Sequence, residues 1–446
     1  MFSSERLQRI TVCGLGKLGA CVAASMAARG FEVVGIDVDR CKVESFTKGV
    51  APVLEPRLQG MIDQSGGRLR ATTNFGDALE RSQSCFFVTP TPSLPDGSFS
   101  NEYLLKAMKE VATQVRQRKR AGFLFVINST VTPGSCVGVI KPILEQELSG
   151  KCGRDFGLCY NPEFIALGDV VHGLLGPDFV LIGESDMVSG TLLQQLYHRF
   201  NTNGAPVERM SLSSAELAKI SVNCAVTMKI SFANQLSAIC AKIPEADPGA
   251  ILRAIGRDRR IGQEYLRPGL GFGGPCFPRD NRLFQYTAHS VGVEAPLAEA
   301  TDKVNDVVNA RLLETVLAHT RDGAPVGVLG LAYKPFTGVI DYSPGVWLCQ
   351  RLAERGRQVF AHDYQAGGAA SALLSGEMVV IYEDPKDLFL RGCSTLAITC
   401  PWPGYAELFE SAAHQIPPGS VVVDPWSVLE QVATKLEAVS YITRLE

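Results

Sequence analysis

The sequence predicts an α/β protein with two separate parallel sheets and a helical segment between them. Short apolar runs that suit buried strands alternate with helical patterns over the first 200 or so residues. The same alternation starts again at Pro325 and continues to the end of the chain. Between the two regions, residues 211–243 form the longest uninterrupted helical pattern. A chain of 446 residues is also too long for one core, so we expect two or three domains.

Composition limits the kind of partner. A net charge of −3 gives no electrostatic footprint for nucleic acid, and the apolar runs are too short to span a membrane. We therefore expect a small-molecule ligand. The thirteen cysteines form no C-x-x-C pair and no cluster with histidine at zinc spacing, so no metal site is expected. Without a secretory pattern at the start, we expect reduced thiols and a cytoplasmic protein.

The first strand leads into a glycine-rich turn. Residues 9–37 read as an apolar strand, then Gly14, Gly16 and Gly19, an alanine-rich helix, and a second strand that ends in Asp37. This is the full context of a Rossmann dinucleotide-binding turn, which favours that function over a glycine turn of another kind. Because a carboxylate repels a 2′-phosphate, the acid favours NAD over NADP.

Further cofactor contacts are expected around this turn and at the ends of later strands. Leu18 lies within the turn, and Arg40 follows the acid, where its charge slightly weakens the preference for NAD. Thr89 and Thr130 follow apolar strands, at the strand ends where a doubly wound sheet places its ligands. The alternative for Ser129 and Thr130 is that they only cap the next helix.

Two candidate residue groups come from the middle of the chain. Glu163 follows a strand in the segment Asn-Pro-Glu-Phe, although a surface-loop glutamate would be the favoured reading of this segment alone. The long helix is expected to begin at a cap, Ser213 or Ser214, and to be buried on most faces. Lys219 and Asn223 are four apart on it and share one face, and a buried lysine is costly unless it meets a partner or ligand.

The segment from Pro268 to Asp280 is a loop suited to presenting a thiol. Six glycines or prolines precede Cys276 within eight positions, so the backbone can approach a ligand closely, and exposed N–H groups can bind phosphate oxygens. Taken alone, an inert buried cysteine is an equally good reading. A thiol beside a nicotinamide cofactor permits two oxidations, because it traps an aldehyde and carries the resulting thioester to hydrolysis.

At this point the chain resembles a known family. The motifs GLGKLG, VTPTP, STVTPG, NPEF, AELAKISVN, RIG, PGLGFGGPCFPRD and GLAYKP, with a distant SP pair, follow the order of the UDP-glucose/GDP-mannose 6-dehydrogenase family. The resemblance covers nearly the whole chain. It implies an NAD-binding Rossmann domain at 1–210, a central helical domain used for homodimerisation at 211–320, and a Rossmann-like domain binding the nucleotide sugar at 321–446.

The resemblance also implies roles for individual residues. Six would be catalytic: the nucleophile Cys276, Asp280 as base partner of a water, Lys219 and Asn223 at the oxyanion, Thr130 near the water, and Glu163 in thioester hydrolysis. The substrate would contact Glu163, Phe164, Lys219, Asn223, Tyr265, Gly273, Lys334 and, from the neighbouring subunit, Arg260. The implied reaction oxidises the C6 alcohol of a nucleotide sugar to the uronic acid with two NAD.

Two positions depart from the family pattern on the recognition side. Leu167 occupies the place of a glutamate, and Asp341 stands where the family commonly has an arginine. An anion in place of a cation would weaken diphosphate binding unless another cation compensates. Two alternatives therefore stay open: a two-electron dehydrogenase of the β-hydroxyacid type, in which Cys276 is structural, and a nucleotide-sugar-binding protein with impaired turnover. The nucleotide and the sugar are not predicted.

Overall fold

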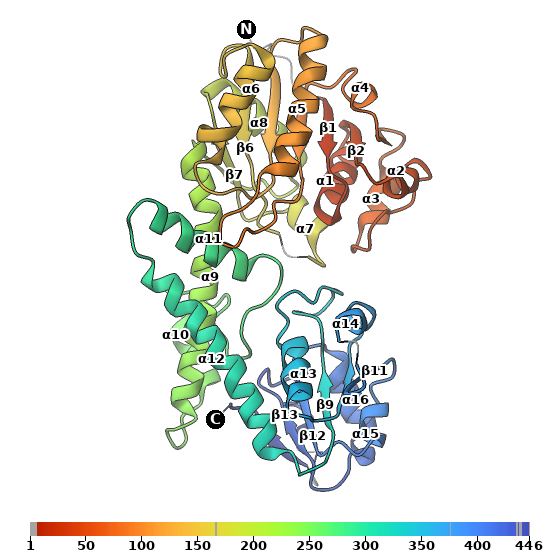
Figure 1. Cartoon of the computed structure of the whole chain (residues 1–446), viewed down its shortest axis with the longest axis vertical. Coiled ribbons are helices and arrows are strands. Elements are labelled where there is room, and N and C mark those ends of the chain that lie inside the picture. The colour runs from red at the N-terminus through yellow and green to blue at the C-terminus, as the bar shows by residue number, and fades with distance from the viewer. Residues whose placement is uncertain (1–6, 166, 375, 434–435, 437–438, 446) are drawn as a thin grey trace. The chain divides into compact units, whose positions relative to one another are not determined.

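The computed structural model describes residues 7–165, 167–374, 376–433, 436 and 439–445. The chain divides into two compact units, Met1–Ser221 and Val222–Glu446, which are taken in turn (Figure 1). Two parallel-sheet regions and the helical segment between them in sequence confirm the predicted fold class.

The first unit is built on one eight-stranded sheet. Its strand order is β3-β2-β1-β4-β5-β6-β7-β8, so the chain crosses over β1 in the doubly wound manner. All neighbouring strands pair in parallel except β6 and β7, which pair antiparallel through Cys159 and Glu184. The strands are β1 (Arg9–Cys13), β2 (Glu32–Ile36), β3 (Leu69–Thr72), β4 (Ser84–Phe87), β5 (Phe123–Ile127), β6 (Phe156–Tyr160), β7 (Val180–Glu184) and β8 (Val207–Ser211).

Helices pack against this sheet and bury its apolar strands. The central strands β4, β5 and β6 are buried at every position, as their continuous apolar runs predict. The helices are α1 (Lys17–Ala28), α2 (Arg40–Thr47), α3 (Leu58–Gln64), α4 (Phe75–Ala78), α5 (Glu102–Gln117), a π-helical turn (Cys136–Ile140), α6 (Lys141–Leu148), α7 (Val170–Leu175) and α8 (Met187–Phe200).

The long helix α9 (Leu212–Cys240) carries the chain from the first unit into the second. The prediction that it begins at Ser213 or Ser214 was wrong. The hydroxyl of Ser211 accepts the N–H of Ser214 at 3.2 Å and so provides the capping hydrogen bond. The serine-rich start offered several possible caps, and the strand β8 that ends at Ser211 was not predicted.

The second unit combines helices with a six-stranded parallel sheet of order β11-β10-β9-β12-β13-β14. Its strands are β9 (Val326–Leu329), β10 (Val359–His362), β11 (Val379–Tyr382), β12 (Thr395–Ile398), β13 (Val421–Val423) and β14 (Ser440–Ile442). Its helices, after α9, are α10 (Pro248–Gly256), α11 (Phe277–Ser290), α12 (Pro296–His319), α13 (Pro344–Glu354), α14 (Gly367–Leu373), α15 (Asp387–Leu390), α16 (Gly404–Ala412) and a 3-10 turn (Ala413–Gln415).

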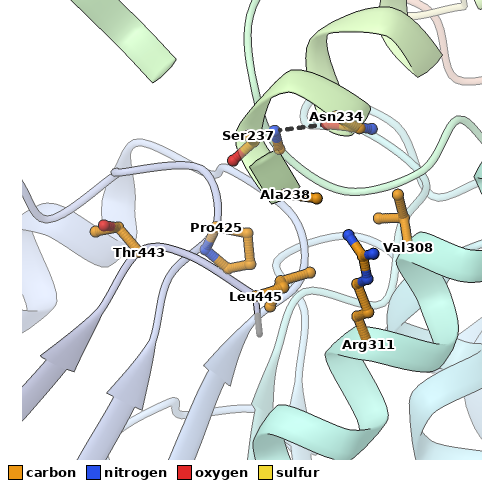
Figure 2. A pocket seen from close by; sticks show the side chains of 9 residues that line it. Asn234, Ser237, Ala238, Val308, Arg311, Pro425, Thr443 and Leu445 are labelled. Carbon is orange, nitrogen blue, oxygen red and sulfur yellow. Dashed lines mark hydrogen bonds between the residues drawn. The ribbon is translucent and has the colours of Figure 1, made fainter. Parts of the chain in front are cut away.

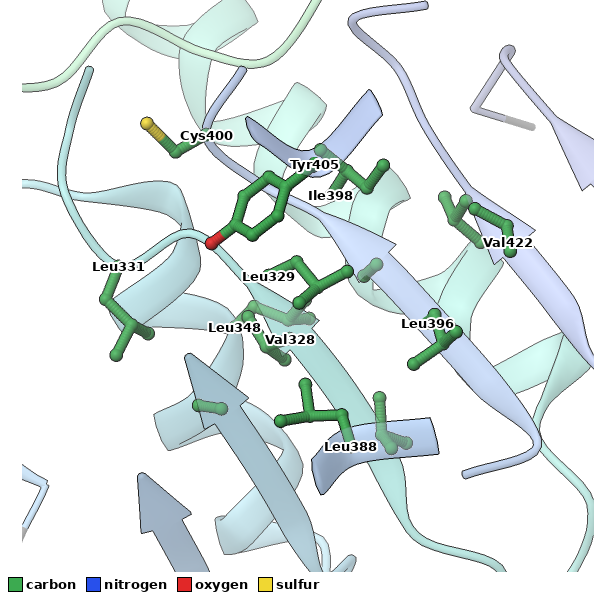
Figure 3. Close-up of a cluster of buried hydrophobic side chains, with 14 of the residues drawn as sticks. Val328, Leu329, Leu331, Leu348, Leu388, Leu396, Ile398, Cys400, Tyr405 and Val422 are labelled. Atoms are coloured by element: carbon green, nitrogen blue, oxygen red, sulfur yellow. The ribbon is translucent and has the colours of Figure 1, made fainter. Parts of the chain in front are cut away.

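A continuous hydrophobic core joins the second sheet to its helices. Val328 and Leu329 of β9, Leu348 of α13 and Leu396 of β12 are fully buried together (Figure 3). Leu312 of α12 belongs to the same cluster, so this helix is part of the core of the second unit. Within the described residues, no helix is both long enough and apolar enough to cross a lipid bilayer.

Candidate active site

The glycine turn after β1 combines close packing with one open position. Gly14 has φ +100°, and a Cβ there would lie 2.3 Å from the carbonyl oxygen of Val88. A Cβ on Gly19 would lie 1.8 Å from the carbonyl oxygen of Gly14. Gly16, by contrast, is the N-cap of α1, and a Cβ there would meet nothing within 4 Å. The open space at a helix N-terminus without a side-chain cap fits a pyrophosphate.

Asp37 closes the same turn. Its Oδ2 accepts the N–H of Leu15 at 2.6 Å, and its Oδ1 accepts the N–H of Asp39 at 2.9 Å. An ionised carboxylate has about four acceptor positions, so ribose hydroxyls can still be bound. Arg40 is exposed at the start of α2, and Leu18 is partly buried against the core of the sheet. The chain's own residues at this turn therefore fit NAD.

The segments that follow β4 and β5 are joined by hydrogen bonds of serine and threonine hydroxyl groups. The N–H of Thr89 donates to the Ser129 hydroxyl at 2.9 Å, which donates to the carbonyl of Thr89 at 2.7 Å. The Thr91 hydroxyl donates to the carbonyl of Thr130 at 2.7 Å. The next helical turn begins at Cys136 and has no side-chain cap, so Ser129 and Thr130 do not cap it. The simple capping alternative is wrong.

Glu163 is a partly buried acid at the carboxyl end of β6. The hydroxyl of Tyr197 on α8 donates to its Oε1 at 3.2 Å. Burial raises the pKa of Glu163 to about 7, while the Tyr197 hydrogen bond and the charge of Lys219 oppose that rise. A carboxyl with a pKa near neutrality is suited to exchanging protons with a substrate or water.

Lys219 of α9 is a buried cation in the same unit. Its side chain is only 6% exposed, and its Nζ lies 4.8 Å from the centre of the Phe164 ring. Within the part of the chain that the structure describes, Nζ has no hydrogen bond or ion pair; its described contacts are this ring and the charge of Glu163. An ammonium group so placed is costly unless a ligand accepts its protons.

Glu216, one turn before Lys219, has a structural role that the sequence analysis missed. Its side chain is fully buried, and its two oxygens accept the N–H groups of Gly134 and Cys136, each at 2.7 Å. The loop that carries Thr130 is therefore fastened to α9 near Lys219. An acid in a largely apolar helix was the signal that could have revealed it.

In the second unit, Cys276 is the N-cap residue of α11, and its side chain is exposed. The only other exposed cysteine among the described residues is Cys41. Elsewhere burial raises thiol pKa values, to about 12 for Cys13, Cys21 and Cys224. Because a helix N-terminus favours an anion, Cys276 is placed to react as a thiolate, whereas the buried thiols are not.

Asp280 lies one helical turn after Cys276, and its N–H donates to the Cys276 carbonyl at 2.8 Å. Asp280 is 4% exposed and Asn223 of α9 is 9% exposed. The Asn223 amide donates from Nδ2 to Oδ2 of Asp280 at 2.5 Å. Of the predicted residues of the second unit, Asn223 and Asp280 are thus brought into direct contact beside the base of the cysteine loop.

The glycines before Cys276 pack closely against other residues of the second unit. A Cβ would lie 2.3 Å from the Trp426 ring at Gly269, 2.5 Å from Asn305 at Gly271, and 2.4 Å from the Tyr342 carbonyl at Gly273. Gly274 has φ +84°, a Cβ there would meet the Tyr333 ring at 2.5 Å, and its N–H donates to the Asp341 carbonyl at 2.8 Å. Neighbouring protein atoms therefore already require these glycines, which the sequence analysis explained by the close approach of a ligand.

A cavity in the second unit lies at the start of this loop (Figure 2). It is lined by Asn234, Ser237, Arg311, Thr443 and neighbours and holds none of the predicted site residues. The Asn234 side chain accepts the N–H of Gly269 and donates to the Leu270 carbonyl, both at 3.0 Å. It therefore anchors the loop that presents Cys276.

The remaining predicted residues are Arg260, Tyr265 and Lys334, and all three belong to the second unit. Arg260 is exposed and pairs with Asp258 at 2.6 Å. Tyr265 has φ +59°, is 50% exposed, and its ring makes an edge contact with that of Phe277. Lys334 follows β9 and lies 6.0 Å from the Tyr333 ring centre.

The two departures from the family pattern differ in their setting. Leu167 is partly buried against the core of the first sheet, where an apolar side chain is stable. Asp341 is exposed, and its neighbour Tyr342 accepts a hydrogen bond from Arg282 of α11 at 3.2 Å. The Arg282 guanidinium also lies over the Tyr342 ring, 5.3 Å from its centre, so a cation contacts the residue that follows Asp341 in the sequence.

Comparison with known proteins gives a consistent result. Three models of the UDP-glucose/GDP-mannose dehydrogenase family match: the NAD binding domain at residues 8–201, the central domain at 213–307 and the UDP binding domain at 327–431. A GDP-mannose 6-dehydrogenase of Pseudomonas syringae pv. syringae is 34% identical over 93% of this chain and 95% of its own. A UDP-glucose 6-dehydrogenase of Haloferax volcanii is 37% identical over 79% and 83% of the two chains.

A solved structure agrees over the whole length. The UDP-glucose dehydrogenase of Pyrobaculum islandicum superimposes with a TM-score of 0.87 and 32% identity, covering 99% of this chain and 98% of that one. These matches confirm the resemblance, the enzyme class and NAD as the cofactor. The chain is an oxidoreductase and belongs to the UDP-glucose/GDP-mannose dehydrogenase family.

Proposed function

We propose that this protein oxidises the C6 alcohol of a nucleotide sugar to the uronic acid in two steps, with Cys276 as the covalent nucleophile. The observation that carries the proposal is the contrast among the thiols. Cys276 is exposed at the N-terminus of a 14-residue helix, while burial disfavours the thiolate of most others. A thiol in that position is unnecessary for a single alcohol oxidation, but it permits a second one by holding the aldehyde as a thiohemiacetal.

The cofactor would be held by the turn after β1. The N-terminus of α1 at Gly16 would receive the pyrophosphate, and Asp37 would accept from the adenosine ribose. NAD, when bound, supplies a hydride acceptor for each oxidation. A carboxylate at Asp37 disfavours a 2′-phosphate, which supports NAD rather than NADP.

The chain's own residues supply the remaining chemistry. In the first oxidation the alcohol loses a hydride and a proton to give an aldehyde, and the Cys276 sulfur then bonds to the carbonyl carbon. The carbonyl oxygen takes up the thiol proton, and the second oxidation removes a hydride from that carbon and the proton from its hydroxyl, which leaves a thioester. Water cleaves the carbon–sulfur bond, which releases the acid and restores the thiol.

Five residues would serve these steps. Lys219 would donate to the sugar oxygen and stabilise the developing oxyanion, consistent with a buried ammonium that has no described hydrogen-bond partner. Asn223 has a second N–H besides the one given to Asp280 and would act at the same oxygen. Asp280, with Thr130, would position a water and take up protons. Glu163, with a pKa of about 7, would serve thioester hydrolysis.

Substrate recognition would involve both the cysteine loop and the second sheet. Tyr265, Gly273 and Lys334 are proposed contacts of the nucleotide diphosphate, with Phe164 against the sugar. Asp341 stands where the family commonly has an arginine, so this chain lacks that cation. We propose that Arg282, which contacts Tyr342, supplies the compensating positive charge. The relatives include both GDP-mannose and UDP-glucose dehydrogenases, and the proposal covers both nucleotide types.

The test is NADH release against a panel of nucleotide sugars, with mass spectrometry of the product. The proposal predicts two NADH per molecule of uronic acid for at least one substrate. One NADH per product would favour a two-electron dehydrogenase. Tight substrate binding without NADH release across the panel would favour a binding protein.

We also propose that the protein is a homodimer. Met228, Phe232 and Ile239 are 42%, 51% and 50% exposed, and their spacing of four and seven places them on one face of α9. Covering that face with a second copy would remove apolar surface from water, and exposed Arg260 would be free to reach the partner. Phe232→Glu should give a monomer in analytical ultracentrifugation, whereas exposed Met187→Glu on α8 should not.

A further inference from the structure

A buried tyrosine lies against the acid assigned to thioester hydrolysis. Tyr197 of α8 is 3% exposed and Asn161, directly after β6, is 1% exposed. The Tyr197 hydroxyl lies 3.2 Å from Oε1 of Glu163 and 2.5 Å from Oδ1 of Asn161. Two acceptors therefore face one phenolic hydroxyl, which has a single proton to donate.

The orientation of Asn161 is fixed by its other contacts. Its Nδ2 donates to the Leu181 carbonyl of β7 at 2.9 Å, so its Oδ1 is the atom directed at Tyr197. Its backbone carbonyl accepts from Nδ2 of Asn128 at 2.7 Å. Since Asn161 is held on two sides, it can act as a permanent acceptor for the tyrosine.

The two protonation states of Glu163 demand opposite roles of the hydroxyl. When Glu163 is ionised, the Tyr197 proton points to the carboxylate. When Glu163 is neutral, its own proton can be donated to the Tyr197 oxygen, and the tyrosine proton turns to Asn161. Each state then has a complete set of hydrogen bonds in a buried site.

We propose that Tyr197 is a positioning residue for the hydrolytic step, which holds Glu163 in both protonation states by turning its hydroxyl proton between Glu163 and Asn161. The inference rests on the proposed function of Glu163 and adds to it a residue outside the motifs that identify the family.

The charges around the pair set the direction of the expected effect. The ionisable groups that act on Glu163 are Tyr197 from α8 and Lys219 from α9, and both favour its ionised form. Burial and the charge of Glu163 raise the pKa of Tyr197, so the phenol remains protonated. Removing the hydroxyl takes away one group that favours the ionised acid, and the pKa of Glu163 should rise.

The experiment is the pH profile of kcat for acid release in Tyr197→Phe. The ionised form of Glu163 is the one proposed to act on the attacking water, so the acidic limb of the profile should move to higher pH by about one unit, because a hydrogen bond to a charged group is lost. Tyr405→Phe is the matched control, since Tyr405 is also fully buried and hydrogen-bonded, through His362 of the second sheet. Its acidic limb should stay in place.

A double substitution separates this effect from general damage. In the Glu163→Gln background no carboxyl is left to titrate against Tyr197, so adding Tyr197→Phe should not move the pH profile of the residual first oxidation. An acidic limb that stays in place in Tyr197→Phe, while the wild type releases acid, would overturn this inference alone. A wild-type enzyme that releases one NADH and no acid would overturn the proposed function as well.

Infrared titration gives a second route that does not need Tyr197→Phe to fold. The Glu163 carboxyl band is identified by its loss in Glu163→Gln and should titrate near pH 7. A tyrosine C–O band should change with the same midpoint and should stay constant in Glu163→Gln. A Glu163 band that titrates with no accompanying tyrosine change would contradict the proposed turning of the hydroxyl.

Discussion

The turns that follow the first strand of each sheet, β1 and β9, share a backbone geometry but differ in the hydrogen-bond acceptors and the space that they leave for a ligand. After β1, the N–H of Gly14 donates to the Ile36 carbonyl at 2.8 Å. After β9, the N–H of Gly330 donates to the His362 carbonyl at the same distance, 2.8 Å. Both glycines have positive φ, +100° and +111°. The same backbone turn, with the same hydrogen bond to the neighbouring strand, therefore occurs in both sheets.

The acids that follow the second strand of each sheet separate the two turns. Asp37 is bonded to two backbone N–H groups and keeps acceptor capacity. Asp363 accepts five donors, which are the backbone N–H groups of Leu331, Ala332, Gln365 and Ala366 and Nε1 of Trp402. The second turn also lacks the open glycine that Gly16 provides in the first. The shared backbone geometry is therefore required by the fold. The unused acceptor positions of Asp37 and the open space at Gly16 are the features that serve a ligand.

The largest expected effect comes from adding one methyl group at the matching helix glycines. A Cβ would lie 1.8 Å from the Gly14 carbonyl at Gly19 and 2.0 Å from the Gly330 carbonyl at Gly345. Gly19→Ala and Gly345→Ala should each lower the free energy of unfolding by about 3 kcal/mol, because the backbone must shift. Only Gly19→Ala should also weaken NAD binding.

Urea unfolding followed by circular dichroism and by tryptophan fluorescence measures the loss of stability in Gly19→Ala and Gly345→Ala. All three tryptophans lie in the second unit, so fluorescence reports its unfolding. Gly368→Ala is the control, since a Cβ there meets nothing within 4 Å. An altered affinity for NAD in Gly345→Ala would break the comparison.

The next effect contrasts the two acids. Asp37→Ala should raise the Kd for NAD about tenfold through lost hydrogen bonds to the ribose. Asp363→Ala should leave that Kd unchanged but lower the free energy of unfolding by about 3 kcal/mol, because buried N–H groups lose their acceptor. Isothermal titration calorimetry and urea denaturation measure the two quantities. The same response of both variants in both measurements would show that the acids do not differ in role.

The third expected effect concerns Glu163, whose carboxyl is disfavoured in its ionised form by burial. Its pKa of about 7 lies above the ordinary 4.5, so the folded state binds its proton more tightly than the unfolded state does. Stability is therefore lost as pH rises from about 4.5 to 7. Glu163→Gln should be more stable than the wild type by about 3 kcal/mol at pH 8 and equal to it at pH 4. Equal stabilities at pH 8, measured by urea denaturation, would contradict the raised pKa.

Much of this could be predicted from sequence, because the relevant signals are local. The turn of Gly14, Gly16 and Gly19 between two strands requires one geometry, and the structure has it. The exposed thiol at Cys276 agrees with a loop that presents it, but the loop was predicted to extend to Asp280, whereas the structure begins α11 at Phe277. Local backbone requirements are written in the sequence itself.

Contacts between distant segments could not be predicted. Tyr197 lies 34 residues after Glu163, and Glu216 lies 80 residues after Cys136, with no motif that links them. The glycines before Cys276 were attributed to a ligand, whereas Trp426 and Tyr342 already leave no room for a Cβ at Gly269 and Gly273. A glycine shows that something comes close, without showing what it is.

The most direct test of the two-step oxidation is the yield of uronic acid from Cys276→Ala, with the exposed Cys41→Ala as the matched control. We expect Cys276→Ala to bind NAD normally and to form no acid, and Cys41→Ala to release two NADH per acid as the wild type does. Acid formation by Cys276→Ala at the wild-type yield would contradict the account.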